Sequence, residues 1–247
     1  MFNRTPNPTG TGPAISLDKI QATAPGLVDL YKRAGVSLEK NGIAGTRAAV
    51  YLVLDRSGSM RNYYRDGSVQ RLAEQALGLS AQLDDDGSVP LVFFDSRAYP
   101  AIEMDLTDYQ GRIDREHERL GGMGTTNYAA AMEMVIDHYQ ASGSTAPAFV
   151  IFQTDGSPDS KTAAEQVLCR ASTLPIFWQF IGFGKDSFRF LRKLDDLAVP
   201  TKRAIDNAGF FAAGSNPSAI PDGELYDRLM DEYPTWLASA RAAGIAP

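Results

Sequence analysis

The sequence predicts an α/β fold: a doubly wound, mostly parallel central sheet with helices on both faces and one antiparallel edge strand. Near-continuous apolar runs of strand length recur along the chain, as expected for strands that a parallel sheet buries on both faces. Between these runs, apolar residues recur at helical spacing, and strands that alternate with helices form parallel sheets. The 247 residues, 44% of them hydrophobic, are enough for one large domain of this kind and an extension.

Two segments precede the predicted sheet. Residues 1–15 are rich in Pro, Gly, Thr and Asn, which predicts a disordered N-terminal arm. Residues 16–45 place apolar side chains near helical or turn spacing around Pro25 and Gly26, which predicts a helical N-terminal extension. This extension is too small to fold alone, so we expect it to pack on the main domain, residues 46–247.

The elements of the main domain follow in alternation. Five apolar runs predict the parallel strands, at residues 48–55, 89–95, 148–155, 175–184 and 208–214. Residues 98–106 alternate between apolar and polar side chains, which predicts an edge strand that pairs as a hairpin with the second run. Helical spacing predicts helices near residues 69–83, 108–119, 127–140, 160–173, 186–197 and 223–243.

Composition excludes several classes of partner. The net charge of -6 and the pI near 5.0 argue against binding to the negatively charged backbone of nucleic acid. No segment approaches the roughly 20 apolar residues that span a bilayer, and the first residues lack the apolar stretch of a secretory signal. The single cysteine, Cys169, has no partner for an intrachain disulfide. We therefore expect a cytoplasmic protein with no nucleic-acid partner and no membrane span.

The strongest functional signal is a set of polar clusters that follow the predicted strands. Ligands of open parallel sheets bind at the carboxyl edge, where the strands end. In the cluster DRSGSM, Asp55, Ser57 and Ser59 stand at every second position. In an extended or gently turning loop, this spacing aims three oxygen-bearing side chains to one side. In the cluster GGMGTTNYAAAM, glycines lead to Thr125 and Thr126 at the start of a helix.

A third cluster, FQTDGSPDS, places Asp155 at the tip of a predicted buried strand. Together the clusters offer hard oxygen ligands, which suit Mg²⁺, with Mn²⁺ or Ca²⁺ as alternatives, whereas the chain has only two histidines for zinc or copper. Each residue also has an ordinary role available, as a helix cap or a turn residue. The combination favours a metal site, because caps and turns do not require this set of residues at neighbouring strand ends.

These residues resemble a known motif. The D-x-S-x-S sequence after the first strand, a Thr before the third helix and an Asp-Gly after the fourth strand are similar to the metal-ion-dependent adhesion site of von Willebrand factor A (vWA) domains. The resemblance implies that the hydroxyls of Ser57, Ser59 and Thr126 contact the metal directly. It also implies that Asp55 and Asp155 hold the waters of the metal or orient those hydroxyls.

The resemblance covers roughly residues 46–243. Residues 16–40, followed by VYLVLDRSGSM, are similar to bacterial stress or tellurium-resistance-associated proteins of this class. The chemistry of the side chains leaves Thr125 and Thr126 open as alternatives, whereas the family pairing of Thr with a following Asn or Asp selects Thr126. Three neutral ligands would leave most of the divalent charge unneutralised, and a coordination position free for an incoming carboxylate.

The sequence thus predicts a non-catalytic module that uses Mg²⁺ to bind an Asp or Glu of a partner protein, in a bacterial stress or tellurium-resistance system. The alternative is a Mg²⁺-dependent hydrolase or phosphatase that uses the same cation to activate water. That reaction needs a base near the metal, and Asp55 and Asp155 are already committed to the ion. A scaffold with a vacant site ranks third, and the sequence makes no prediction about the oligomeric state.

Overall fold

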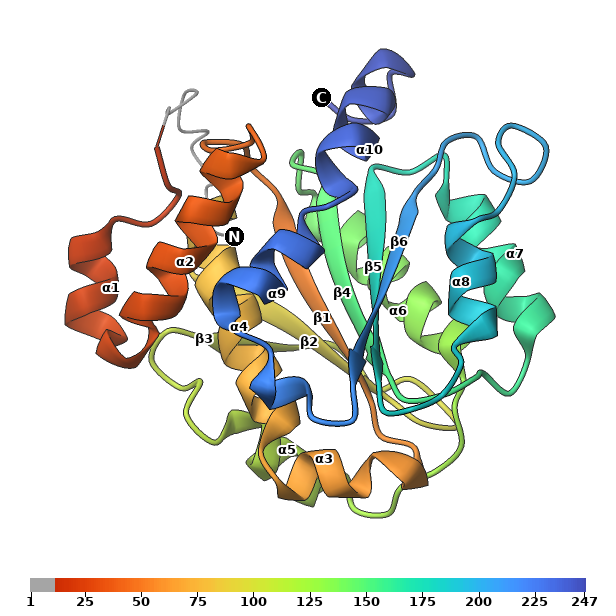
Figure 1. Cartoon of the computed structure of the whole chain (residues 1–247), viewed down its shortest axis with the longest axis horizontal. Helices are drawn as coiled ribbons and strands as arrows, with labels where there is room; N and C mark the ends of the chain where they lie inside the picture. Colours follow the sequence, from red (N-terminus) through yellow and green to blue (C-terminus); the bar gives the residue numbers. More distant parts are fainter. Residues whose placement is uncertain (1–11) are drawn as a thin grey trace.

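A computed structural model describes residues 12–247 and contains a six-stranded sheet with the order β3-β2-β1-β4-β5-β6 (Figure 1). The strands are β1 (Ala49–Asp55), β2 (Ser88–Phe94), β3 (Ile102–Asp105), β4 (Ala148–Thr154), β5 (Ile176–Phe183) and β6 (Ala208–Gly214). All neighbouring pairs are parallel except β2 and β3, which are antiparallel. The predicted α/β fold with one antiparallel edge strand is therefore confirmed.

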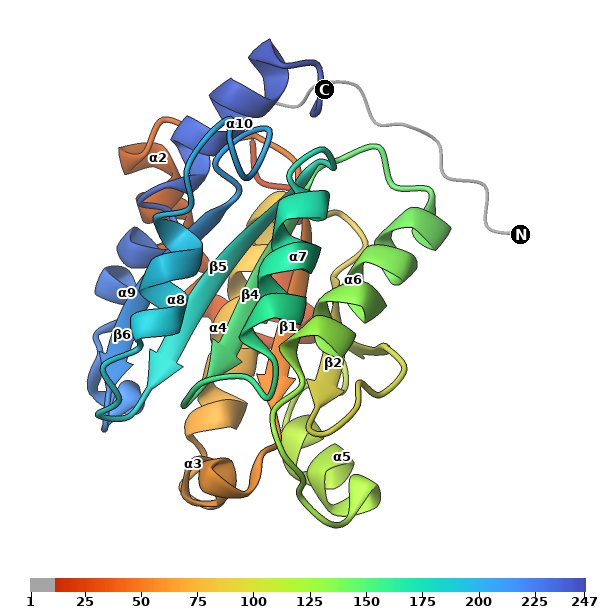
Figure 2. The same ribbon diagram turned by 90° about the vertical axis from the view of Figure 1, so that its right-hand side faces the viewer.

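Helices cover both faces of the sheet. They are α1 (Leu17–Thr23), η1 (Pro25–Leu27), α2 (Val28–Lys40), η2 (Gly58–Met60), α3 (Arg61–Arg65), α4 (Ser68–Leu83), α5 (Arg112–Leu120), α6 (Tyr128–Ser142), α7 (Lys161–Ala171), α8 (Arg189–Asp195), η3 (Pro217–Ala219), α9 (Asp222–Leu229) and α10 (Tyr233–Ala242). Helices α6, α7 and α8 lie on one face (Figure 2), while α2, α4 and α9 lie on the other. Each face has its own hydrophobic core, and the strands between them are buried on both sides.

The single helix expected over residues 223–243 is wrong, because the structure divides it into α9 and α10. The N–H of Met230 donates to Tyr226 O, which completes the last turn of α9. Helix α10 begins three residues later, with Pro234 in its first turn. Proline has no N–H to donate and its ring clashes with the preceding helical turn, so it is tolerated at a helix start but not in the interior. The apolar spacing continues across the break, and it alone did not reveal the break.

The N-terminal extension packs on the face that carries α4 and α9. Gly78 of α4 lets α2 approach closely, since a Cβ at this position would lie 2.9 Å from Leu30 Cβ. Ser37 Oγ of α2 donates to Asp227 Oδ1 of α9 at 2.8 Å. These contacts join the beginning of the described chain to its C-terminal helices.

The expected disordered arm, residues 1–15, lies mostly outside the described residues. Its last residues are packed: the N–H of Ala14 donates to Gln82 O, and the N–H of Ile15 donates to Ala81 O. The side chain of Ile15 is 2% exposed. Residues 14 and 15 therefore belong to the packed extension rather than to the arm. Over residues 12–247, no helix has both the length and the apolar character needed to cross a membrane.

Candidate metal centre

The candidate centre starts where β1 and β4 end at the carboxyl edge of the sheet. The two strands are parallel neighbours, which brings Asp55 at the end of β1 next to Thr154 at the end of β4. Thr154 Oγ1 donates to Asp55 Oδ2 at 2.6 Å, and the N–H of Ser57 donates to Asp55 Oδ1 at 2.6 Å. The Asp55 side chain is completely buried. Its carboxylate thus fixes the turn that brings Ser57 into the site.

Hydroxyl groups connect this turn to the end of β4. Ser57 Oγ and Ser59 Oγ are 3.1 Å apart, and Ser59 Oγ donates to Asp155 Oδ1 at 2.8 Å. Ser57 is buried, Asp155 is half-buried and Ser59 is exposed, so the chain of oxygens runs from the interior to the surface. Four of the five predicted metal residues, Asp55, Ser57, Ser59 and Asp155, therefore lie in one hydrogen-bonded cluster.

The loop with the two candidate threonines lies beside this cluster. Ser57 and Gly124 form an isolated parallel bridge, in which the N–H of Gly58 donates to Gly124 O at 3.1 Å. A Cβ on Gly124 would lie 2.5 Å from Ser96 Oγ, which explains the glycine at this position. The structure thus places the start of the threonine segment against the D-x-S-x-S turn.

The two threonines differ in how their hydroxyls are used. Thr125 Oγ1 lies 2.7 Å from Asp159 Oδ2 and 3.0 Å from Ser96 Oγ, so it is held in a network at the surface. Thr126 is fixed through its backbone, because its N–H donates to Asp159 Oδ2 and its carbonyl accepts from the Asp159 N–H. Among residues 12–247, the Thr126 hydroxyl has no hydrogen-bond partner, and it makes no hydrogen bond to the four-residue cluster.

Among residues 12–247, no Lys or Arg forms an ion pair with either carboxylate of the cluster. Burial raises the pKa of Asp55 to about 6, and the charge of Asp155 adds to this effect, whereas hydrogen bonds from Thr154 and Ser57 oppose it. Burial also raises the pKa of Asp155, the charge of Asp186 adds to the rise, and the hydrogen bond from Ser59 opposes it. No Lys or Arg is among the groups that shift either pKa. A bound cation would supply the missing positive charge.

The donor set fits a hard divalent cation. Within the described part of the chain, no group of three or more His, Cys, Asp or Glu side chains is placed to hold a metal, so a site here depends on hydroxyl oxygens as well as carboxylates. Hydroxyl, carboxylate and water oxygens are the ligands that Mg²⁺, Mn²⁺ and Ca²⁺ prefer. The cluster offers these oxygens and no sulfur or imidazole ligand.

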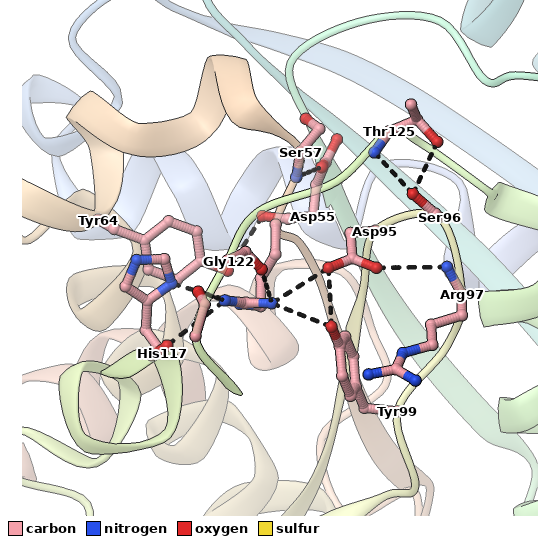
Figure 3. Close-up of polar contacts among 12 residues, drawn as sticks. Asp55, Ser57, Tyr64, Asp95, Ser96, Arg97, Tyr99, His117, Gly122 and Thr125 are labelled. Atoms are coloured by element: carbon pink, nitrogen blue, oxygen red, sulfur yellow. Dashed lines mark hydrogen bonds and ion pairs between the residues drawn. The ribbon is translucent and has the colours of Figure 1, made fainter. Parts of the chain in front are cut away.

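Arg56, which occupies the first variable position of D-x-S-x-S, belongs to the site although it was not predicted from the sequence. Its side chain is completely buried and forms the centre of a polar network, and Figure 3 labels its partners Asp95, Tyr99, His117 and Gly122. The guanidinium and its Nε donate to Gly121 O (2.7 Å), Asp95 Oδ2 (3.2 Å), Tyr99 Oη (3.3 Å), Gly122 O (3.4 Å), His117 O (3.4 Å) and His117 Nδ1 (3.4 Å). A buried charge needs such partners, and an arginine directly after a buried strand was the signal in the sequence.

This network ties the threonine loop to the strand ends. Arg56 holds the carbonyls of Gly121 and Gly122, a few residues before the threonines, while Asp95 follows the neighbouring strand β2 and accepts from Tyr99 Oη at 2.8 Å. His117 stacks on Tyr64, with ring centroids 4.1 Å apart. Burial and the charge of Arg56 lower the pKa of His117, which keeps its Nδ1 available as an acceptor. The loop is therefore positioned by a buried polar core beneath the candidate centre.

Known proteins with similar sequences or folds agree with the fold described above. The chain is similar to the protein named "Uncharacterized protein YcbR" of Bacillus subtilis (strain 168), with 37% identity over 223 residues that cover 88% of this chain and 89% of the relative. The fold is similar to that of manganese-loaded TRAP protein of Plasmodium vivax (TM-score 0.51, 21% identity, 74% of each chain covered). It is also similar to a von Willebrand factor type A protein of Catenulispora acidiphila (TM-score 0.53, 15% identity), with 75% of this chain and 43% of that chain covered.

Residues 47–246 match the model of the vWA-TerF-like family, which is described as the vWA found in the TerF C terminus. This match covers the whole sheet, the D-x-S-x-S turn, the threonine loop and the Asp155 loop. The resemblance to vWA domains of the tellurium-resistance-associated type is thereby confirmed. The chain belongs to the vWA-TerF-like family of von Willebrand factor A domains.

Proposed function

We propose that this protein is a divalent-cation-dependent interaction module that binds an acidic group of a partner protein. One observation carries the proposal: Asp55, Ser57, Ser59 and Asp155 form one hydrogen-bonded cluster whose two carboxylates have no positive partner among residues 12–247. The cluster reaches the surface at Ser59, so a cation held there is accessible to a second protein.

The residues present define how a cation would be held. Ser57, Ser59 and Thr126 offer hydroxyl oxygens as direct ligands, while Asp55 and Asp155 orient these hydroxyls or hold bound water. The cation, when bound, supplies a Lewis acid whose charge is only partly neutralised, and a carboxylate of the partner completes its coordination. The Thr126 hydroxyl, which lacks a hydrogen-bond partner within residues 12–247, fits a role that begins when the cation is present.

We propose Mg²⁺ as the cation, with Mn²⁺ or Ca²⁺ as alternatives, because all candidate ligands are hard oxygens. The manganese-loaded state named for the TRAP protein supports a divalent ion in a domain of this fold. The TerF description of the family supports a place in a bacterial stress or tellurium-resistance system. We propose the cytoplasm as the location, since the single cysteine of the chain needs no oxidising compartment. The acidic composition agrees with a protein partner rather than a nucleic acid.

An enzymatic role is the second candidate, since Mg²⁺ also serves phosphoryl chemistry. A hydrolase would need a free base beside the cation. The Asp55 carboxylate already accepts from Thr154 and from the N–H of Ser57, and Asp155 accepts from Ser59. These contacts favour a binding role over catalysis. Cation-dependent turnover of a phosphatase substrate panel that is lost in Asp155→Asn would favour the enzyme instead.

Calorimetric titration of the full chain with Mg²⁺ and Mn²⁺ tests the proposal. A cation that binds only the folded state at 100 times its Kd stabilises the protein by about 2.7 kcal/mol, so Tm should rise by several degrees. Ser59→Ala and Asp155→Asn should weaken binding at least tenfold. Ser157→Ala, an exposed serine in the Asp155 loop, is the matched control and should bind like the wild type. Unchanged binding in Ser59→Ala and Asp155→Asn would contradict the proposal.

A further inference from the structure

Five exposed basic side chains lie in the segments that follow β1, β4 and β5, at the edge of the sheet that carries the candidate metal centre. They are Arg61 and Arg65 of α3, Lys161 at the start of α7, Lys185 in the β5–α8 loop and Arg189 at the start of α8, and together they form the basic rim. None of them has a carboxylate within salt-bridge distance among residues 12–247. Arg65 donates instead to Asn62 Oδ1 at 2.9 Å, and Lys161 Nζ lies 6.0 Å from the centroid of the Phe190 ring.

Topology places the rim at one edge of the sheet. Helices α3, α7 and α8 follow β1, β4 and β5, so their N-terminal residues lie at the carboxyl edge, together with Asp55 and Asp155. Figure 1 shows α3 at the end of the molecule toward which the strand arrows point, and α10 at the opposite end. The ring of Tyr63 packs on Phe183 with centroids 5.3 Å apart, which brings α3 against the end of β5.

Elsewhere on the surface some exposed bases, such as Lys19, Lys32 and Arg97, form no ion pair within residues 12–247, and others do. Several exposed or half-exposed bases away from this edge form ion pairs, as in Lys40–Asp227, Arg71–Asp222, Arg170–Glu133, Lys193–Glu165 and Arg228–Glu224. Near the centre, in contrast, the exposed acids are used by the backbone and hydroxyl groups of the chain. Asp66 accepts from the N–H of Ser68, Asp186 from the N–H of Phe188, and Asp159 from the threonine loop.

The exposed side chains at this edge are therefore mainly basic, in contrast to the acidic protein as a whole. In the segments 58–66, 155–161 and 184–189, five exposed bases stand against three exposed acids, Asp66, Asp159 and Asp186, and the half-buried Asp155, whereas the chain has a net charge of -6. A divalent cation would add to this positive field. Such a surface attracts an acidic ligand and repels a basic one before any contact forms.

We propose that the basic rim binds acidic residues that flank the metal-binding carboxylate of the partner, so that the partner presents a segment with several Asp or Glu residues. This inference rests on the proposed function, because it names the chemistry of the segment that would reach the cation. The residues of the basic rim come from α3, α7 and α8 and from the loop before α8, so they are spread along the edge of the sheet. This spread suits an extended segment that lies across the centre. A phosphate polymer is disfavoured, because Asp159 and Asp186 are interspersed among the bases and the chain is acidic overall.

Two synthetic peptides of equal length test the rim directly. The first carries one central Glu between neutral Gln and Ser residues, and the second carries the same central Glu with two Glu residues on each side. Binding to the full chain is measured by fluorescence polarisation at low salt, with Mg²⁺ or Mn²⁺ and with EDTA. The second peptide should bind about tenfold more tightly, because two or three exposed ion pairs together contribute an affinity gain of about this size. The difference in affinity should shrink at high salt.

A charge-reversed variant and a matched control isolate the rim from the metal centre. Arg61→Glu with Lys185→Glu should remove the preference for the acidic peptide while the cation affinity measured by calorimetry falls no more than a few-fold. Lys32→Glu with Arg241→Glu changes the net charge equally on exposed helix positions away from this edge and should keep the preference. Both variants are compared at equal helicity, measured by circular dichroism.

The outcomes separate this inference from the proposed function. Equal binding of the two peptides to a protein that does bind the cation would overturn the rim and leave the proposed function intact. Failure of the wild type to bind any cation would overturn the proposed function. Cation-independent binding of single-stranded oligonucleotide that exceeds peptide binding would also overturn the rim proposal, since the surface would then recognise phosphate polymers.

Discussion

Arg56 and Asp95 form a buried ion pair, with 3.2 Å between Arg56 Nη1 and Asp95 Oδ2 and with neither residue more than 4% exposed. The pair joins the ends of β1 and β2 and also holds the backbone carbonyls of the loop that leads to Thr126. The order of the candidate centre therefore depends on a charge pair that would not itself contact the cation.

Substitutions in this pair should affect stability and loop order together. Asp95→Asn leaves a buried guanidinium charge unpaired and should cost about 3–5 kcal/mol of unfolding free energy. Arg56→Lys keeps the charge but loses most carbonyl contacts, so we expect a smaller cost of about 1–3 kcal/mol. Urea unfolding measures both values, and hydrogen exchange should become faster over residues 120–126. Arg97→Lys, at an exposed neighbouring position, is the control, and equal costs for all three variants would contradict the role of the pair.

The two threonines should separate metal binding from loop stability. Thr126→Ala removes a candidate ligand whose hydroxyl makes no hydrogen bond within residues 12–247, so we expect at least tenfold weaker Mg²⁺ binding with little change in metal-free stability. Thr125→Ala removes the contacts to Asp159 and Ser96 and should cost about 1 kcal/mol, with cation affinity nearly retained. Calorimetry and metal-free thermal unfolding distinguish the two. The reverse pattern would make Thr125 the ligand.

A carboxyl cluster at the start of α10 should make stability depend on pH. Burial, with the charges of Asp195, Asp206 and Asp231, raises the pKa of Glu232 to about 7. A folded pKa above the unfolded value means that the favourable contribution of the protonated group is complete at acidic pH. It is lost progressively as the pH rises from 4.5, the ordinary value, to about 7. Glu232→Gln should therefore raise the Tm at pH 8 by about 2–4 °C and at pH 5 by only about 1 °C or less.

Thermal unfolding in EDTA from pH 5 to pH 8 measures this effect. Glu118→Gln changes an exposed carboxyl group in α5 and serves as the control, with the pH profile of the wild type expected. A Glu232→Gln profile parallel to that of the wild type would rule out Glu232 as the titrating group.

Two helical glycines should respond in opposite ways to alanine. A Cβ at Gly78 would lie 2.9 Å from Leu30 Cβ and 3.1 Å from Tyr226 Oη, so Gly78→Ala must separate α4 from α2 and should cost about 1–3 kcal/mol. A Cβ at Gly223 of α9 would meet no atom within 4 Å, and the φ of this residue is not positive, so Gly223→Ala should be neutral or slightly stabilising. Denaturant unfolding of both variants checks the difference, and equal effects would disprove close packing at Gly78.

The sheet could be predicted from the sequence because its strands are buried on both faces and therefore read as unbroken apolar runs. The five predicted parallel strands agree with the structure to within one residue at each end. The break between α9 and α10 could not be read from apolar spacing, which continues through Met230 and Tyr233. Asp55, Ser57 and Ser59 could be found because they are close in sequence. The contacts of Arg56 could not, since its partners lie 39 to 66 residues further along the chain.

The packing of α2 on α4 and α9 has a consequence for where this protein can be cut. The sequence family begins at residue 47, yet Leu27, Leu30 and Leu38 belong to the same hydrophobic interior as the strands. A protein that began at residue 46 would expose the apolar face of α4 to water. Asp227 of α9 would also lose its contacts to Ser37 and Lys40 of α2. The hydrophobic core therefore extends beyond the residues that match the family model.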